Sequence, residues 1–118
     1  MEEIRVIIAD DNKEMNEFLK NYLDNCEGIR ILGCCYSDEE EVKMIEELKP
    51  DVVITDLIRE GRPSGLEIIK RYKKREMIPK FLVITAGTDD LIDIEIMDGY
   101  IRKPIVDYEL VVKELRRI

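Results

Sequence analysis

The sequence contains no histidine, and only three of its 118 residues are cysteine. Without histidine, the chain has no imidazole of its own to serve as a general base or as a metal ligand. The cysteines are odd in number and two of them, Cys34 and Cys35, are adjacent. This pattern does not fit a disulfide framework and favours a reducing cytoplasm.

Long apolar segments are also absent. Runs such as Val6-Ile7-Ile8-Ala9 are far too short to cross a bilayer, and the acidic start does not resemble a signal peptide. The 27 acidic residues outnumber the 19 basic ones, for a net charge of −8, which disfavours contact with a nucleic-acid backbone. We therefore expect a cytoplasmic protein with no direct binding to nucleic acid or membrane. The length and the 45% apolar content predict a single folded domain over residues 1–118.

Short apolar runs alternate with longer segments of helical periodicity. The runs predict strands at 4–9, 29–35, 52–55, 81–84 and 100–101, and the periodic segments predict helices at 13–25, 38–48, 66–72 and 108–115. Three of the runs are continuously apolar, as expected for strands covered on both faces. The alternation predicts an α/β fold: a doubly wound, five-stranded parallel sheet with helices on both faces.

Ligands of open parallel α/β sheets bind beyond the carboxyl ends of the strands. The predicted strands end at Asp10-Asp11, Tyr36-Ser37, Asp56, Thr85 and Lys103. Three carboxylates brought together repel one another unless a cation lies among them, and a hard divalent ion such as Mg²⁺ is the natural partner. The ammonium of Lys103 and the hydroxyl of Thr85 suit phosphoryl oxygens. The pattern therefore predicts a site that receives a phosphoryl group on a carboxylate nucleophile.

Four motifs lie in order at these strand ends. They are Val6-Ile7-Ile8-Ala9-Asp10-Asp11-Asn12, Val53-Ile54-Thr55-Asp56, Val83-Ile84-Thr85-Ala86 and Tyr100-Ile101-Arg102-Lys103-Pro104. Through them the whole chain resembles the receiver domain of two-component response regulators, which has a flavodoxin-like fold. The resemblance implies that Asp56 is the phosphoacceptor in a phosphorelay. The donor would be a phosphohistidine on a sensor histidine kinase or on a His-containing phosphotransfer protein.

The resemblance also implies a metal site. Asp11 and Asp56 would ligate Mg²⁺ directly, together with the backbone carbonyl of Ile58, and Asp10 would hold the ion through water. A receiver domain assists its own phosphorylation and dephosphorylation, so we do not expect an enzyme that acts on other substrates.

A switch is implied as well. Lys103 would pair with the phosphoryl group, Thr85 would move to bond it, and Tyr100 would turn inward behind Thr85, changing a protein-interaction surface. The Lys103-Pro104 peptide bond would be cis, which proline permits.

Two segments depart from the family pattern. The loop over 57–65 is one residue longer than usual, its proline is displaced to Pro63, and it adds the charged residues Arg59, Glu60 and Arg62. The span from Thr85 to Lys103 is shorter than usual by about one helical turn. We therefore expect the fourth helix, within 86–98, to be short or missing.

Three other patterns have structural interpretations. Ser37 followed by Glu40 predicts a helix cap, and the acidic stretch 38–41 predicts a solvated first turn of that helix. The basic cluster 70–75 lies late in a helix, where cations are favourable. Cys34 and Cys35 are expected to pack on opposite faces of a strand.

Three alternative functions are open. The opening residues 8–12 also resemble the start of DNA-binding transcriptional regulators, of which this chain would be the receiver fragment. A Mg²⁺-dependent phosphohydrolase with an aspartyl nucleophile usually has an acid two residues further on, where this chain has Ile58. An interaction module that has lost phosphorylation would be expected to lose Asp11, Asp56 or Lys103, and all three are present. Ile58 and Gly87 further predict slow to moderate self-dephosphorylation.

Overall fold

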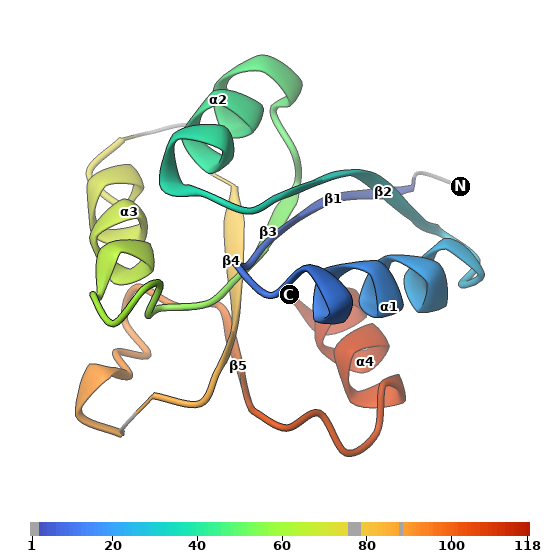
Figure 1. The fold of residues 1–118 in the computed structure, drawn as a ribbon. Helices are drawn as coiled ribbons and strands as arrows, with labels where there is room; N and C mark the ends of the chain where they lie inside the picture. Colours follow the sequence, from blue (N-terminus) through green and yellow to red (C-terminus); the bar gives the residue numbers. More distant parts are fainter. Residues whose placement is uncertain (1–2, 76–78, 88) are drawn as a thin grey trace.

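Five parallel strands form the centre of the molecule (Figure 1). The computed structural model describes residues 3–75, 79–87 and 89–118. The strands are β1 (Ile4–Ala9), β2 (Ile29–Cys35), β3 (Val52–Thr55), β4 (Lys80–Thr85) and β5 (Gly99–Arg102). Their order in the sheet is β2-β1-β3-β4-β5. All four pairings are parallel, so the predicted doubly wound sheet is confirmed.

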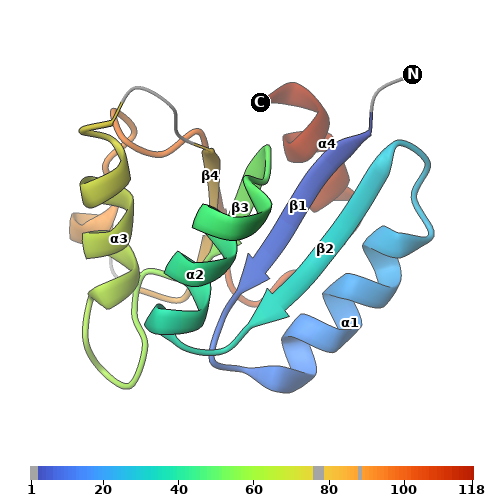
Figure 2. The ribbon, with the colours of Figure 1, turned by 90° about the horizontal axis from the view of Figure 1, so that it is seen from above.

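Two helices cover each face of the sheet (Figure 2). They are α1 (Lys13–Asp24) and α4 (Glu109–Arg117) on one face, and α2 (Asp38–Leu48) and α3 (Ser64–Tyr72) on the other. Side chains alternate along β1, so Val6 faces α1 and α4 while Ile7 faces α2 and α3. Each strand thus contributes to two cores, which explains the continuous apolar runs. Cys34 and Cys35 divide in the same way, as predicted.

Side-chain caps start two helices directly after strands. The Asn12 side chain accepts a hydrogen bond from the amide of Met15 at 3.0 Å, at the beginning of α1. At the beginning of α2, Oγ of Ser37 accepts from the amide of Glu40 at 3.3 Å, which confirms the predicted cap. These caps keep the connections short at the carboxyl edge of the sheet.

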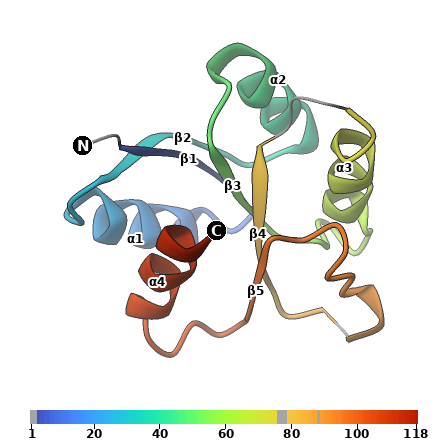
Figure 3. The same ribbon diagram turned by 180° about the vertical axis from the view of Figure 1, so that it is seen from behind.

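The connection from β4 to β5 is irregular (Figure 3). Its described residues contain only a short 3₁₀ turn, η1 (Asp89–Leu91). The helix expected to be short or missing is therefore absent from the described part of this segment, and the helix labelled α4 is the C-terminal one. Apolar residues still anchor the segment, because Leu91, Ile92 and Ile96 pack on the core shared with α2 and α3. Within the described ranges, no helix is long and apolar enough to span a membrane.

Candidate functional site

Two aspartates and one lysine meet at the carboxyl edge of the sheet. Asp10 follows β1, Asp56 follows the neighbouring strand β3, and Lys103 follows β5. Nζ of Lys103 donates to Oδ2 of Asp10 and to Oδ2 of Asp56, each at 2.8 Å. Asp10 is 2% exposed and Asp56 is 7% exposed, so these charges interact largely away from water.

Main-chain groups hold both carboxylates from a second side. The amide of Asn12 donates to Oδ1 of Asp10 at 2.9 Å, and the amide of Ile58 donates to Oδ1 of Asp56 at 3.2 Å. Each carboxylate therefore has one oxygen on Lys103 and the other on a backbone N–H. Such contacts fix the orientation of the carboxylates before any ligand binds.

Burial and charge act against each other in this cluster. Burial raises the pKa of Asp10, although hydrogen bonds from Lys103 and Asn12 oppose the rise. Burial by itself would lower the pKa of Lys103, but the hydrogen bonds to Asp10 and Asp56 and their negative charges together outweigh that effect and raise it. Lys103 is therefore protonated at neutral pH and is the counter-charge for two carboxylates.

The remaining predicted metal ligands lie at the same edge. Asp11 is exposed, and its Oδ2 accepts from the amide of Glu60 at 3.4 Å. Ile58 directly follows Leu57 in the loop after β3, and its amide is the one that contacts Asp56. In the described parts of the chain, no three His, Cys, Asp or Glu side chains are arranged as a metal site. The ammonium of Lys103 is the positive charge that lies against Asp10 and Asp56.

The two predicted switch residues come from β4 and β5. Thr85 is fully buried, and its Oγ1 accepts from the amide of Gly87 at 3.1 Å. The amide of Lys103 donates to the carbonyl of Thr85 at 2.9 Å, which joins the two strand ends. The Tyr100 hydroxyl is buried and has no hydrogen-bond partner among the described residues. The Lys103-Pro104 peptide bond is cis.

The longer loop after Asp56 contains a small hairpin. Arg59 and Arg62 exchange two backbone hydrogen bonds, of 2.9 and 3.0 Å. Between them, Glu60 and Gly61 have φ values of 52° and 76°, the left-handed backbone of a two-residue hairpin turn. The turn contacts Asp11 through the amide of Glu60.

The prediction that the acidic stretch 38–41 is solvated is wrong for Glu41. Glu41 is 0% exposed and pairs with the Arg59 side chain, whose Nη2 lies 2.5 Å from Oε1 of Glu41. One signal was available: Glu41 precedes the buried Ile45 by four residues, so both lie on the same helix face. Arg59 lies in a loop, and no periodicity indicates that its side chain is buried.

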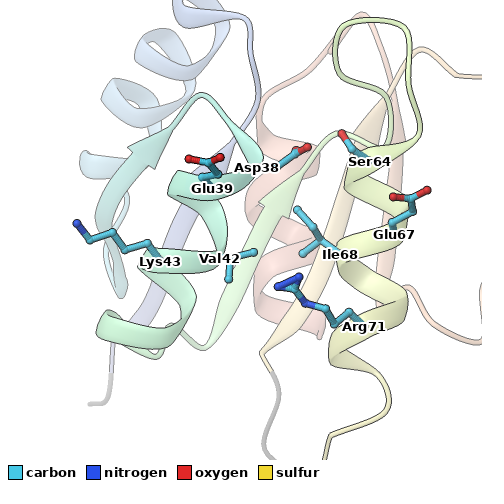
Figure 4. Close-up of a pocket in the computed structure, with 8 residues that line it drawn as sticks. All are labelled: Asp38, Glu39, Val42, Lys43, Ser64, Glu67, Ile68 and Arg71. Atoms are coloured by element: carbon cyan, nitrogen blue, oxygen red, sulfur yellow. The ribbon is translucent and has the colours of Figure 1, made fainter.

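Cavity size does not identify the functional site. The larger opening, of about 620 Å³, is a groove between α2 and α3 lined by Val42, Ile68 and Arg71 among others (Figure 4). Asp10, Asp56 and Lys103 are not among the residues that line it. A smaller pocket of about 390 Å³ is lined by Asp11, Arg59 and Glu60 and lies at the carboxyl edge.

The strand order and the charged carboxyl edge define a flavodoxin-like α/β domain. A family model for the response regulator receiver domain matches residues 6–115, and the chain belongs to this family.

Solved structures of response regulators are similar in fold to this chain. The signal receiver domain of the response regulator NarL from Mycobacterium tuberculosis has a TM-score of 0.85 at 20% identity, over 99% of this chain and 96% of that one. The response regulator domain of Thermotoga maritima CheB has a TM-score of 0.80 at 23% identity, over 98% and 95%. A LuxR-family DNA-binding response regulator from Staphylococcus aureus has a TM-score of 0.84 at 23% identity, over 97% of each chain.

Proposed function

We propose that this receiver domain accepts a phosphoryl group on Asp56 from a phosphohistidine donor, with Mg²⁺ as cofactor. The observation that carries the proposal is the pair of 2.8 Å contacts from Lys103 to Asp56 and Asp10 at the carboxyl edge. Asp56 is the better nucleophile of the two aspartates because it is the more exposed one. Asp10 lies deeper, and burial disfavours its charged form.

The chemistry is a displacement at phosphorus. A carboxylate oxygen of Asp56 attacks the phosphorus atom, the P–N bond of the donor breaks, and its electron pair returns to the imidazole nitrogen of the donor. Lys103 neutralises part of the charge on the transferred group, and the Ile58 amide holds Oδ1 of Asp56. This chain has no histidine, so the donor imidazole lies outside it.

The donor atoms at this edge fit Mg²⁺. Asp11, Asp56 and the carbonyl of Ile58 would ligate the ion directly, and Asp10 would hold it through water. All of them offer the hard oxygen atoms that Mg²⁺ prefers. The negative charge of Asp56 is one of the influences that raise the pKa of Asp10, so the pocket favours additional positive charge. When bound, Mg²⁺ would supply that charge to the carboxylates and to the incoming phosphoryl oxygens.

Thr85 and Tyr100 would transmit the change. Oγ1 of Thr85 accepts from Gly87, which leaves its hydroxyl hydrogen to donate to a phosphoryl oxygen. A shift of Thr85 would move the irregular segment after β4. The Tyr100 hydroxyl, which has no partner among the described residues, would gain a hydrogen bond there. The result is a protein-interaction surface that changes on phosphorylation and binds a downstream target protein.

The test is phosphorylation by acetyl phosphate with Mg²⁺, followed by intact-mass spectrometry. We expect one phosphate on the wild type and none on Asp56→Asn. The matched control is Asp24→Asn, which changes an aspartate at the end of α1 and should accept phosphate normally. Phosphate on Asp56→Asn, or none on the wild type, would contradict the proposal.

A second candidate is a receiver that controls a DNA-binding domain in the same protein. It is favoured by the structural similarity to the S. aureus regulator, which is a DNA-binding protein. Sequencing the gene on both sides of the segment that encodes this chain tests it. A coding region for a helix-turn-helix domain would support it, and stop codons on both sides would exclude it.

A further inference from the structure

The Arg59 side chain is buried, at 5% exposure, between the carboxyl ends of β1 and β3. Its Nη2 lies 2.5 Å from Oγ1 of Thr55 and 3.4 Å from each of the carbonyl oxygens of Ala9 and Asp56. The Thr55 hydroxyl in turn donates to the Asp56 carbonyl at 3.2 Å. One nitrogen of Arg59 therefore joins the residue before Asp10 to the main chain of Asp56.

The first turn of α2 supplies the counter-charges. Nη1 of Arg59 donates to Oδ1 of Asp38 at 2.7 Å, and Nη2 pairs with Oε1 of Glu41 at 2.5 Å. A buried guanidinium needs such partners because an uncompensated charge in the interior is costly. Its planar fork also reaches several acceptors at once, which the point charge of a lysine does not. The position of Arg59 is thus set by α2.

The same residue connects to a second aspartate. Arg59 opens the 59–62 hairpin, and the next residue, Glu60, donates its amide to Asp11. The main chain of Asp56 and the side chain of Asp11 are both held by a loop that the Arg59 ion pairs fasten to α2. Lys103 and the Ile58 amide have a different task, because their hydrogen bonds to Asp56 reach its carboxylate and not its main chain.

We propose that Arg59, fixed by Glu41 and Asp38, is a positioning residue for phosphoryl transfer to Asp56, so that the first turn of α2 influences the rate of the reaction. The inference rests on the proposed function. Its physical basis is that a nucleophile displaced by about 1 Å can lose on the order of 10²-fold in rate. Loss of the guanidinium removes its contacts with the Thr55 hydroxyl and with the carbonyl oxygens of Ala9 and Asp56. The backbone hydrogen bond from the Asp56 amide to Ala9 remains, so we expect a small displacement of Asp56 and not a loss of the strand.

The test compares variants in the complete chain. Arg59→Met with Glu41→Gln removes both buried charges at similar volume, and Arg59→Lys keeps the charge without the fork. The control, Arg75→Met with Glu46→Gln, removes an exposed arginine–glutamate pair of 2.6 Å. Glu46 lies in the distal half of α2, and Arg75 lies just after α3. For each protein, the rate constant of Asp56 phosphorylation is measured against acetyl phosphate concentration at saturating Mg²⁺, together with its Tm.

We expect the double variant at Arg59 to phosphorylate about tenfold more slowly, with an unchanged dependence on donor concentration and a Tm close to that of the wild type. Arg59→Lys should be intermediate, and the control pair should match the wild type. A double variant as fast as the wild type would overturn the inference, and so would an equal slowing in the control.

Two further outcomes are decisive. If the double variant does not fold, Arg59→Lys decides: a slower rate supports the positioning role and a wild-type rate refutes it. If the wild type accepts no phosphate on Asp56, the proposed function itself fails. Normal phosphorylation of the wild type together with normal rates in both Arg59 variants refutes only the role of Arg59.

Discussion

Nζ of Lys103 lies 2.8 Å from Oδ2 of Asp56, although the two residues are 47 positions apart in the chain. They meet because parallel strands present their carboxyl ends at one edge, and β3 and β5 are separated only by β4. The same ammonium contacts Asp10 at an equal distance. One cation thus balances two aspartates that the sheet brings together. We expect a change in this balance to affect stability and phosphorylation in opposite directions.

Asp10→Asn should stabilise the protein at pH 7 while impairing its function. Burial raises the pKa of Asp10, so ionisation of this carboxyl group is less favourable in the folded state than in the unfolded state. An amide removes this unfavourable contribution, as at other functional sites that trade stability for activity. Urea unfolding at pH 7 should show a higher midpoint, and acetyl phosphate should label the variant more slowly. A lower midpoint would contradict the prediction.

Mg²⁺ should raise the Tm of the wild type by relieving the repulsion among the aspartates. At a free concentration ten times the dissociation constant, the expected stabilisation is about 1.4 kcal/mol. For a domain of this size, that corresponds to roughly 6 °C. Thermal unfolding with MgCl₂ measures it, with NaCl at equal ionic strength as control. Asp11→Asn should lose most of the shift, and an unchanged Tm in the wild type at millimolar Mg²⁺ would count against the metal site.

Features that follow a repeating sequence pattern could be predicted from the sequence. Features that depend on a single tertiary contact could not. The strand runs predicted the sheet, and the residue after each run predicted that Asp10, Asp56 and Lys103 would meet. The short span before Lys103 also predicted the loss of regular helix between β4 and β5. The burial of Arg59 and Glu41 could not be predicted in this way, because each charge is tolerable inside only when the other is present.

Gly65 should not tolerate alanine, because a Cβ there would overlap the carbonyl oxygen of Asp56. The helix α3 starts against this carbonyl, so the clash would push the helix away from the acceptor residue. We expect a loss of about 2–3 kcal/mol in the free energy of unfolding. Gly28→Ala is the control: it has a φ of 82° but no atom within 4 Å of the added Cβ, so it should cost only about 1 kcal/mol. Equal losses in urea unfolding would refute the clash.

Glu41 should make stability depend on pH. Burial raises the pKa of Glu41 to about 7, although Arg59 opposes the rise. Between the ordinary glutamate pKa of 4.5 and about 7, the folded state binds more protons than the unfolded state, so the Glu41 contribution to stability falls as pH rises. As pH rises through this range, the free energy of unfolding of Glu41→Gln should therefore increase relative to that of the wild type, by at most about 3 kcal/mol.

Urea titrations at several pH values measure this difference for Glu41→Gln. The matched control is Glu39→Gln, which makes the same substitution at an exposed residue of the same helix turn. A constant difference for Glu41→Gln would show that the Glu41 carboxylate titrates normally in the folded protein.

Ile58→Asn should accelerate loss of phosphate from Asp56. A Cβ built on Gly87 would lie 3.2 Å from Cδ1 of Ile58 and 3.3 Å from Oγ1 of Thr85, so the Ile58 side chain covers the segment beside the proposed phosphoryl site. An apolar side chain there cannot orient water. In hydrolysis, the water oxygen attacks phosphorus, the bond from phosphorus to the Asp56 oxygen breaks, and the carboxylate leaves. An asparagine amide could hold that water by hydrogen bonds.

The expected acceleration is about tenfold, below the ~10²–10⁴ of a positioned general base, because an amide orients water without taking its proton. The measurement follows the phosphorylated fraction by intact-mass spectrometry after removal of acetyl phosphate. Ile58→Leu keeps the volume and the apolar character, so it should decay at the wild-type rate. If Ile58→Asn and Ile58→Leu decay equally, water access to Asp56 is controlled by another group, and the neighbouring 59–62 hairpin becomes the next segment to vary.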